Sequence, residues 1–238
     1  MLSQAEKGGV QNTIQNCVTV LQNDPVLADS IRLNLLSERI DIVKPMGWQR
    51  SGPTLTDTDM MYILRRMEKY GLHSEKRVSA AIRIVANENH YHPIRDYLND
   101  LKWDGTERIS HALHRFLGAA EDELTAEALK IFLLGAIKRV FHPGCKFEMM
   151  LCLVGGQGAG KSSFFRLLAI KDEWFSDDLR RMDDDNVFRK LQGHWIMEMS
   201  EMIATANAKS IEEIKSFLSK QKETYKIPYE THPADRLR

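Results

Sequence analysis

The 238-residue sequence predicts an α/β fold, and two stretches carry this prediction. In the first, an apolar run of strand length, Met149 to Val154, leads through a glycine-rich turn into an apolar pattern at helical spacing from Phe164. In the second, the apolar run Trp195 to Met199 leads into acidic residues. Carboxylates at the carboxyl end of a parallel strand face the ligand crevice of an open α/β sheet. We therefore expect a ligand site where these two stretches meet.

The chain ahead of these stretches is predicted to be mainly helical. Apolar residues recur at helical spacing within residues 10–21, 60–67, 78–85, 94–101, 109–117 and 129–137. Residues 37–44 could instead form a short strand. We divide the chain into a helical N-terminal region (1–90), a helical domain that leads onward (91–144) and an α/β core (145–238).

The glycine-rich turn matches the pattern of a phosphate-binding loop, with Gly155, four residues, and then Gly160-Lys161-Ser162. Glycines allow backbone N–H groups to close around phosphates, and the following helix adds the positive end of its dipole. We expect Lys161 to reach the terminal phosphates and the Ser162 hydroxyl to ligate Mg²⁺. The residues predicted to bind a nucleotide, named the phosphate loop below, are Gly155, Gly156, Gln157, Gly158, Ala159, Gly160, Lys161, Ser162 and Ser163.

An acidic residue must accompany such a loop to hold Mg²⁺ and position water. Glu201, at the end of the second apolar run, is our first choice for the catalytic or metal-proximal acid, and Glu198 is the second. The alternative is that both are solvated glutamates on a helix. Asp183 to Asp185 form a rival cluster, but their place before a helical stretch favours helix capping.

The C-terminal stretch combines a predicted helix with clustered lysines. Ser210 and Glu213 have the spacing of a capping box. Tyr225 and Tyr229 are interleaved with lysines, and aromatic rings with cations suit single-stranded nucleic acid. The candidate DNA-binding lysines are Lys215, Lys220, Lys222 and Lys226. The alternative, which composition favours, is a solvated helix face followed by a hairpin.

Composition narrows the function classes. Lys plus Arg and Asp plus Glu both number 33, which argues against a nucleic-acid-coating protein but allows a local basic patch. Three cysteines without CxxC spacing are typical of reduced thiols. The N-terminus is polar and the apolar runs are short, which predicts a cytoplasmic protein without membrane contact. The His90/His92 and His111/His114 pairs lack a cysteine or acidic partner at ligand spacing.

The loop alone leaves the reaction open. No Asn-Lys-x-Asp stretch for guanine recognition is present, which argues against a GTPase. A small-molecule kinase remains possible, because the loop does not indicate which molecule would accept the phosphoryl group. A nucleotide-binding regulatory protein without motor activity is a further alternative.

Four stretches in order, HPIRDYLNDLKWDGTERI, FHPGCKFEMMLCLVGGQGAGKS, LQGHWIMEMSEM and IKSFLSKQKETYKIPYE, resemble the virulence-associated protein E family. The resemblance extends from about residue 12 to the C-terminus. It implies a P-loop ATPase of phages, plasmids or integrated elements, related to superfamily III helicases in the AAA+ class. ATP and Mg²⁺ are the implied cofactors, and single-stranded DNA and a homo-oligomeric ring the implied partners.

The resemblance also implies roles for single residues. Lys161 and Ser162 match the Walker A lysine and hydroxyl. Glu201 matches the acid that ends the Walker B strand, and Glu198 the acid within it. Lys215 matches a lysine in the segment that leads towards a DNA-facing hairpin in related helicases.

Two departures from the family bear on activity. The chain has no room for the upstream primase domain of some relatives, and family members continue past Arg238 into a sensor strand and an arginine finger. We therefore expect a C-terminally truncated core with an unfilled sheet position between the Walker A and Walker B strands. Arginine fingers raise phosphoryl-transfer rates by roughly 10³ to 10⁵, so we expect very slow ATP hydrolysis.

Overall fold

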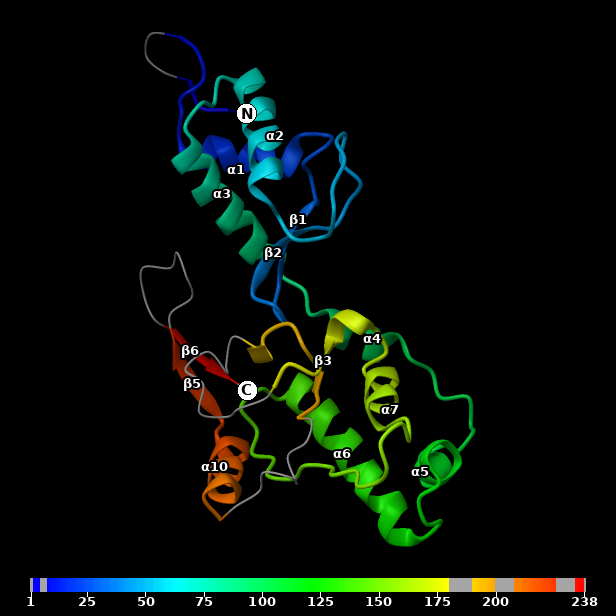
Figure 1. Ribbon diagram of the computed structural model, residues 1–238. Coiled ribbons are helices and arrows are strands. Elements are labelled where there is room, and N and C mark those ends of the chain that lie inside the picture. The colour runs from blue at the N-terminus through cyan, green and yellow to red at the C-terminus, as the bar shows by residue number, and fades with distance from the viewer. Residues whose placement is uncertain (1, 5–7, 180–189, 200–207, 226–233, 238) are drawn as a thin grey trace. The chain divides into compact units, whose positions relative to one another are not determined.

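The computed structural model describes the chain except residues 1, 5–7, 180–189, 200–207, 226–233 and 238 (Figure 1). The chain divides into two compact units, an N-terminal unit, Met1–Asp96, and a C-terminal unit, Tyr97–Arg238. Each unit is described by itself.

The N-terminal unit consists of helices around a short hairpin. Its elements are α1 (Ile14–Asn23), β1 (Ile31–Asn34), β2 (Arg39–Ile42), α2 (Asp57–Met67), the 3-10 turn η1 (Glu68–Tyr70) and α3 (Glu75–Glu88). Strands β1 and β2 are antiparallel, with Ile31 opposite Ile42. The three helices and the strand within residues 37–44 confirm the sequence patterns. Strand β1 carried no sequence signal of its own.

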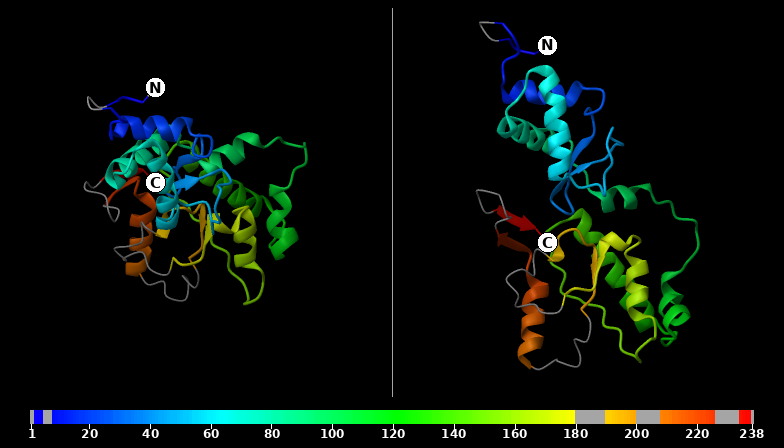
Figure 2. Two further views of the ribbon diagram at one scale, coloured as in Figure 1. Left: turned by 90° about the horizontal axis from the view of Figure 1, so that it is seen from above. Right: turned by 45° about the horizontal axis from the view of Figure 1, so that its top comes forward.

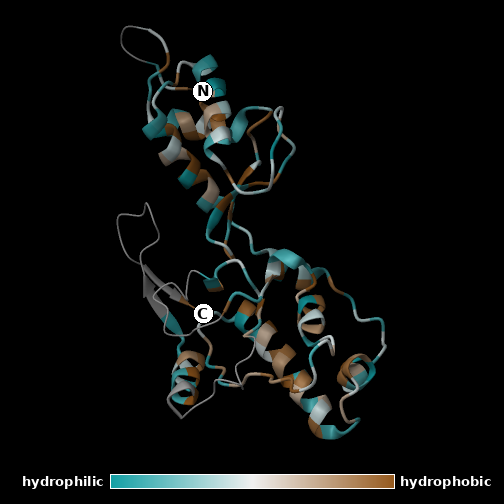
Figure 3. Ribbon diagram, viewed as in Figure 1, coloured by the Kyte–Doolittle hydropathy of each residue, from teal (hydrophilic) through white to brown (hydrophobic). Residues whose placement is uncertain are grey.

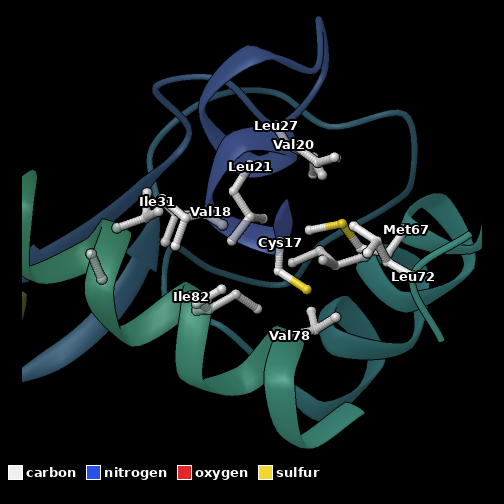
Figure 4. Packing of buried hydrophobic residues seen from close by; sticks show 14 of the residues in the cluster. Cys17, Val18, Val20, Leu21, Leu27, Ile31, Met67, Leu72, Val78 and Ile82 are labelled. Atoms are coloured by element: carbon white, nitrogen blue, oxygen red, sulfur yellow. The ribbon is translucent and has the colours of Figure 1, made fainter. Parts of the chain in front are cut away.

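The apolar stripes of these helices meet in one core (Figure 4). Cys17 and Leu21 of α1, Met67 of α2 and Val78 of α3 are fully buried. Residues three or four apart share one face of a helix, and burying that face stabilises the fold by about 25 cal/mol per Å² of apolar surface. The stripes therefore fix which face of each helix turns inward.

A buried carboxylate, Asp59, ties the loop after β2 to the first turn of α2. It accepts hydrogen bonds from Trp48 Nε1 at 2.7 Å, from Arg50 Nε at 2.8 Å and from the Thr56 backbone N–H at 2.9 Å. Thr56 Oγ1 in turn accepts from the Asp59 N–H, which completes a capping box. Burial alone would raise the pKa of Asp59, but these hydrogen bonds outweigh it and hold the pKa well below its usual range.

The C-terminal unit mixes helices with small sheets. Helix α4 (Pro93–Asp100) leads into it, and its further elements are α5 (Ile109–Leu117), α6 (Glu123–Phe141), α7 (Lys161–Leu168), η2 (Asp172–Trp174), β3 (Phe175–Ser176), β4 (Ile196–Met197), α10 (Ala208–Ser219), β5 (Lys222–Tyr225) and β6 (Ala234–Leu237). Strands β3 and β4 are parallel, and β5 and β6 are antiparallel. The views in Figures 1 and 2 agree that α5, α6 and α7 lie side by side. This mixture is compatible with the α/β class.

The strand predicted at residues 149–154 does not form, and that prediction is wrong. Side-chain burial still alternates along part of the segment, since Leu151 and Leu153 are half-buried in an apolar cluster while Cys152 and Val154 are exposed. A strand also needs backbone hydrogen bonds from a neighbour, and among the described residues no strand pairs with this segment. The apolar run in the sequence indicated a strand but could not provide that partner.

The capping box predicted at Ser210 and Glu213 is also wrong. Helix α10 begins at Ala208, so Ser210 lies inside the helix and not at its N-cap.

Hydrophilic and hydrophobic residues alternate along the helices of both units (Figure 3). In the described parts of the chain, no helix combines the length and the apolar character needed to span a bilayer.

Candidate phosphate site

The phosphate loop leads directly into α7, and its glycines adopt a conformation that other residues resist. Gly158 and Gly160 have φ values of 80° and 81°, in the left-handed region. Gly160 is the N-cap of α7, whose first residue is Lys161. Backbone N–H groups at such a turn and at a helix N-terminus point outward, where they attract anions. The glycine spacing read from the sequence therefore has a conformational reason.

The ammonium group of Lys161 lies across the start of this loop. Its Nζ donates hydrogen bonds to the carbonyl oxygens of Gly155 at 2.9 Å and Gly156 at 2.7 Å. These contacts hold the positive charge against the first two glycines of the loop. Phosphate oxygens are stronger acceptors than carbonyl oxygens for an ammonium group, because the resulting hydrogen bonds join two opposite charges.

A carboxylate from a distant part of the sequence completes the site. Ser162 Oγ, in the first turn of α7, donates a hydrogen bond to Glu198 Oε1 at 2.7 Å. Glu198 directly follows β4, and its backbone N–H donates to the Ser176 carbonyl of β3 at 2.8 Å. This bond extends the parallel ladder by one residue, so the sheet positions the carboxylate. The structure thus brings together two residues that the sequence predicted separately.

The other predicted acids lie outside the described residues. Glu201, our first choice, and Asp183 to Asp185 are among them, so the predicted order of Glu201 before Glu198 stays a prediction. The remaining loop residues are exposed to solvent. These are Gln157, Ala159 and Ser163.

The α5–α6 hairpin packs behind the loop, which the sequence did not predict. Leu113 of α5, Leu129 of α6 and Phe164 of α7 are buried in one cluster. The Leu117 Cδ2 atom lies 3.9 Å from the position that a Cβ on Gly160 would occupy. The apolar stripes of α5 and α6 were visible in the sequence, but their partner was not.

The candidate DNA-binding lysines lie on α10 and at the start of the β5–β6 hairpin. Lys215 Nζ forms an ion pair with Glu212 Oε1 at 2.8 Å, one turn away on the same helix. Lys220 and Lys222 are exposed, and Lys226 lies outside the described residues. A helix followed by a hairpin is common to both interpretations of this segment, so DNA contact by these lysines stays a prediction.

The histidines of α5 share a carboxylate that the sequence spacing did not reveal. His111 Nδ1 lies 2.8 Å from Glu121 Oε1, and His114 Nε2 lies 4.0 Å from Glu121 Oε2. Within the described ranges, no group of three or more His, Cys, Asp or Glu side chains has the arrangement of a metal centre.

A glycine turn at a helix N-terminus, with a carboxylate beside the first helical hydroxyl, defines an α/β protein with a candidate phosphate site. The virulence-associated protein E-like domain matches residues 98–238, and the chain belongs to this family. The matched range contains the phosphate loop and Glu198, whereas the whole N-terminal unit precedes it. Comparison with curated proteins gave no match.

Proposed function

We propose that the chain binds Mg²⁺-ATP at the phosphate loop and hydrolyses it. In this proposal it is the ATP-binding module of a phage or plasmid replication helicase or primase-helicase, in which hydrolysis is coupled to single-stranded DNA and the working form is a ring of several copies. One observation carries the proposal. Lys161, Ser162 and Glu198 meet at an exposed loop in which Gly158 and Gly160 have the left-handed backbone conformation.

The Ser162 and Glu198 oxygens fit a magnesium ion. Mg²⁺ binds oxygen ligands and is held by one or two protein carboxylates together with waters and substrate phosphates. The hydroxyl and carboxylate oxygens are 2.7 Å apart, so both could lie in the coordination sphere of one ion. Held there by Ser162 and Glu198, Mg²⁺ would offset the negative charge of the phosphates.

Each protein group then has a separate task. Lys161 binds the terminal phosphates, for which it exchanges its bonds to Gly155 and Gly156. Glu198 and Ser162 would hold the metal ion. Glu201, at the matching family position, remains the proposed acid that positions the attacking water.

Calorimetric titration with Mg²⁺-ATP tests the site. Hydrogen bonds to charged groups contribute about 1.5–3 kcal/mol, so Lys161→Ala should weaken binding roughly 10- to 100-fold. Lys130→Ala is the matched control, because Lys130 is an exposed α6 lysine whose ammonium pairs only one turn away, with Glu127 Oε1 at 2.8 Å. Equal affinity of wild type and Lys161→Ala would show that the site assignment is wrong.

Turnover measurements separate the motor from its alternatives. Hydrolysis stimulated by single-stranded DNA supports the helicase-type module. ATP binding with no turnover, with or without DNA, supports a regulatory nucleotide-binding protein. Transfer of labelled phosphate to a metabolite would instead reveal a kinase.

A further inference from the structure

We infer that Phe116 of α5 is the surface on which the nucleotide base stacks. This inference rests on the proposed function, since it concerns the other end of the same ligand. It adds the part of the site that the phosphate-binding pattern leaves undefined. The argument starts from how α5 packs against the phosphate loop and α7.

The C-terminal end of helix α5 lies next to the end of the phosphate loop that leads into α7 (Figure 1). Leu117 lies next to Gly160, the N-cap of α7. The Phe116 ring centroid is 6.4 Å from that of Phe164, which lies in the first turn of α7. Phe116 is therefore anchored beside the residues that follow Lys161 and Ser162.

The Phe116 side chain is not needed to fill the apolar core. It remains 65% exposed, whereas Leu113 on the same helix is buried and Leu117 is half-buried against the cluster. The Arg115 guanidinium lies 5.7 Å from the Phe116 ring centroid. An exposed aromatic ring accompanied by a guanidinium is the chemistry that proteins use to stack nucleotide bases.

Stacking on a phenyl ring does not distinguish one base strongly from another, because every base has a π-face. Phe116 therefore supplies affinity for the nucleoside part of the ligand with little preference between ATP and GTP. Inorganic tripolyphosphate has the phosphate chain without the base, so its binding depends on Lys161 and not on Phe116.

Calorimetry with Mg²⁺-ATP, Mg²⁺-GTP and Mg²⁺-tripolyphosphate tests this inference. Phe116→Leu keeps an apolar side chain but loses the aromatic face, and should weaken both nucleotides roughly 5- to 100-fold. Tripolyphosphate affinity should not change, and Phe116→Tyr should restore nucleotide binding. Phe141→Leu is the matched control, because it makes the same change at a partly exposed phenylalanine at the end of α6. Thermal unfolding of each variant checks that the unit remains folded.

The other outcomes overturn distinct claims. Unchanged nucleotide affinity in Phe116→Leu would overturn the stacking role and leave the proposed function intact. A parallel loss of tripolyphosphate affinity would show that Phe116 supports the shape of the loop, which also overturns the inference. Wild-type protein that binds neither ATP nor tripolyphosphate would overturn the proposed function, and the inference with it.

Discussion

Removing the Asp59 carboxylate should destabilise the N-terminal unit severely. The Asp59 side chain is 3% exposed and the Arg50 side chain 13%, so Asp59→Ala leaves a nearly buried guanidinium without its counter-charge. Breaking a buried ion pair from one side costs about 3–5 kcal/mol, and losing the carboxylate half of the capping box costs up to about 1 kcal/mol more, because the Thr56 N–H loses its acceptor. Trp48 Nε1 also loses its acceptor.

We expect the free energy of unfolding lost in Asp59→Ala to lie towards the lower end of the sum of these two costs. Arg50 keeps other hydrogen-bond acceptors when Asp59 is removed. These are the carbonyl oxygens of Ile42, Pro53 and Thr54. We therefore expect a loss of about 4 kcal/mol, a large part of the 5–15 kcal/mol that is typical of a whole domain.

Hydrogen–deuterium exchange read peptide by peptide measures this loss where it occurs. Amides in residues 39–67 should exchange roughly 10³-fold faster in Asp59→Ala, since 1.4 kcal/mol corresponds to a factor of ten. Asp57→Ala removes an exposed carboxylate from the same helical turn and is the matched control. If amides in Asp59→Ala exchanged no faster than in this control, the Arg50–Asp59 ion pair would not be what holds the loop after β2 against α2. Combining Asp59→Leu with Arg50→Met should recover part of the loss.

Three further predictions concern the helices and the site. Gly135→Ala should lower the free energy of unfolding by about 1–3 kcal/mol, as measured by thermal unfolding, because a Cβ there would overlap the Phe147 ring. Gly47→Ala is the control and should not change it, because a Cβ at Gly47 would lie in open space. Gly160→Ala should weaken ATP binding, since a left-handed φ costs a non-glycine residue about 1–2 kcal/mol; unchanged affinity by calorimetry would contradict this. Burial lowers the pKa of His92 from 6.5 to about 4, so the unfolded chain binds more protons between these values. Stability should therefore fall as pH decreases from 6.5 to 4, and urea titrations of His92→Gln should lose this dependence.

Local patterns predicted the helices because helix formation and amphipathic burial repeat within a few residues. Cys17, Leu21 and Val78 were in predicted stripes and are fully buried. The ends of helices were less predictable. Ser210 and Glu213 satisfied the capping spacing, yet α10 starts two residues earlier, at Ala208, because Ser and Glu at this spacing can also lie within a helix.

Strands were predicted less well, because pairing joins segments that are distant in sequence. Residues 149–154 had the length and apolar composition of a strand but lack a partner among the described strands. Strand β1 formed because Ile31 pairs with Ile42, which belongs to the strand that the sequence did indicate. In the site, the glycine spacing indicated a turn ahead of a helix, and Gly158 and Gly160 of that turn have positive φ values. The contact between Leu117 and Gly160 depended on tertiary packing.

The register of β4 explains why Glu198, the second choice from sequence, contacts Ser162. Side chains alternate along a strand, so Glu198 shares a face with Ile196, which is buried. Met197 points to the opposite face, where it packs in a cluster with Leu179 and Phe217. Helix α7 lies against both β3 and β4, so the face of Ile196 and Glu198 is the one that meets Ser162. A shift of one residue in the pairing of β4 would turn Glu198 away from α7, and the parallel ladder, continued by the Glu198 N–H to Ser176, prevents that shift.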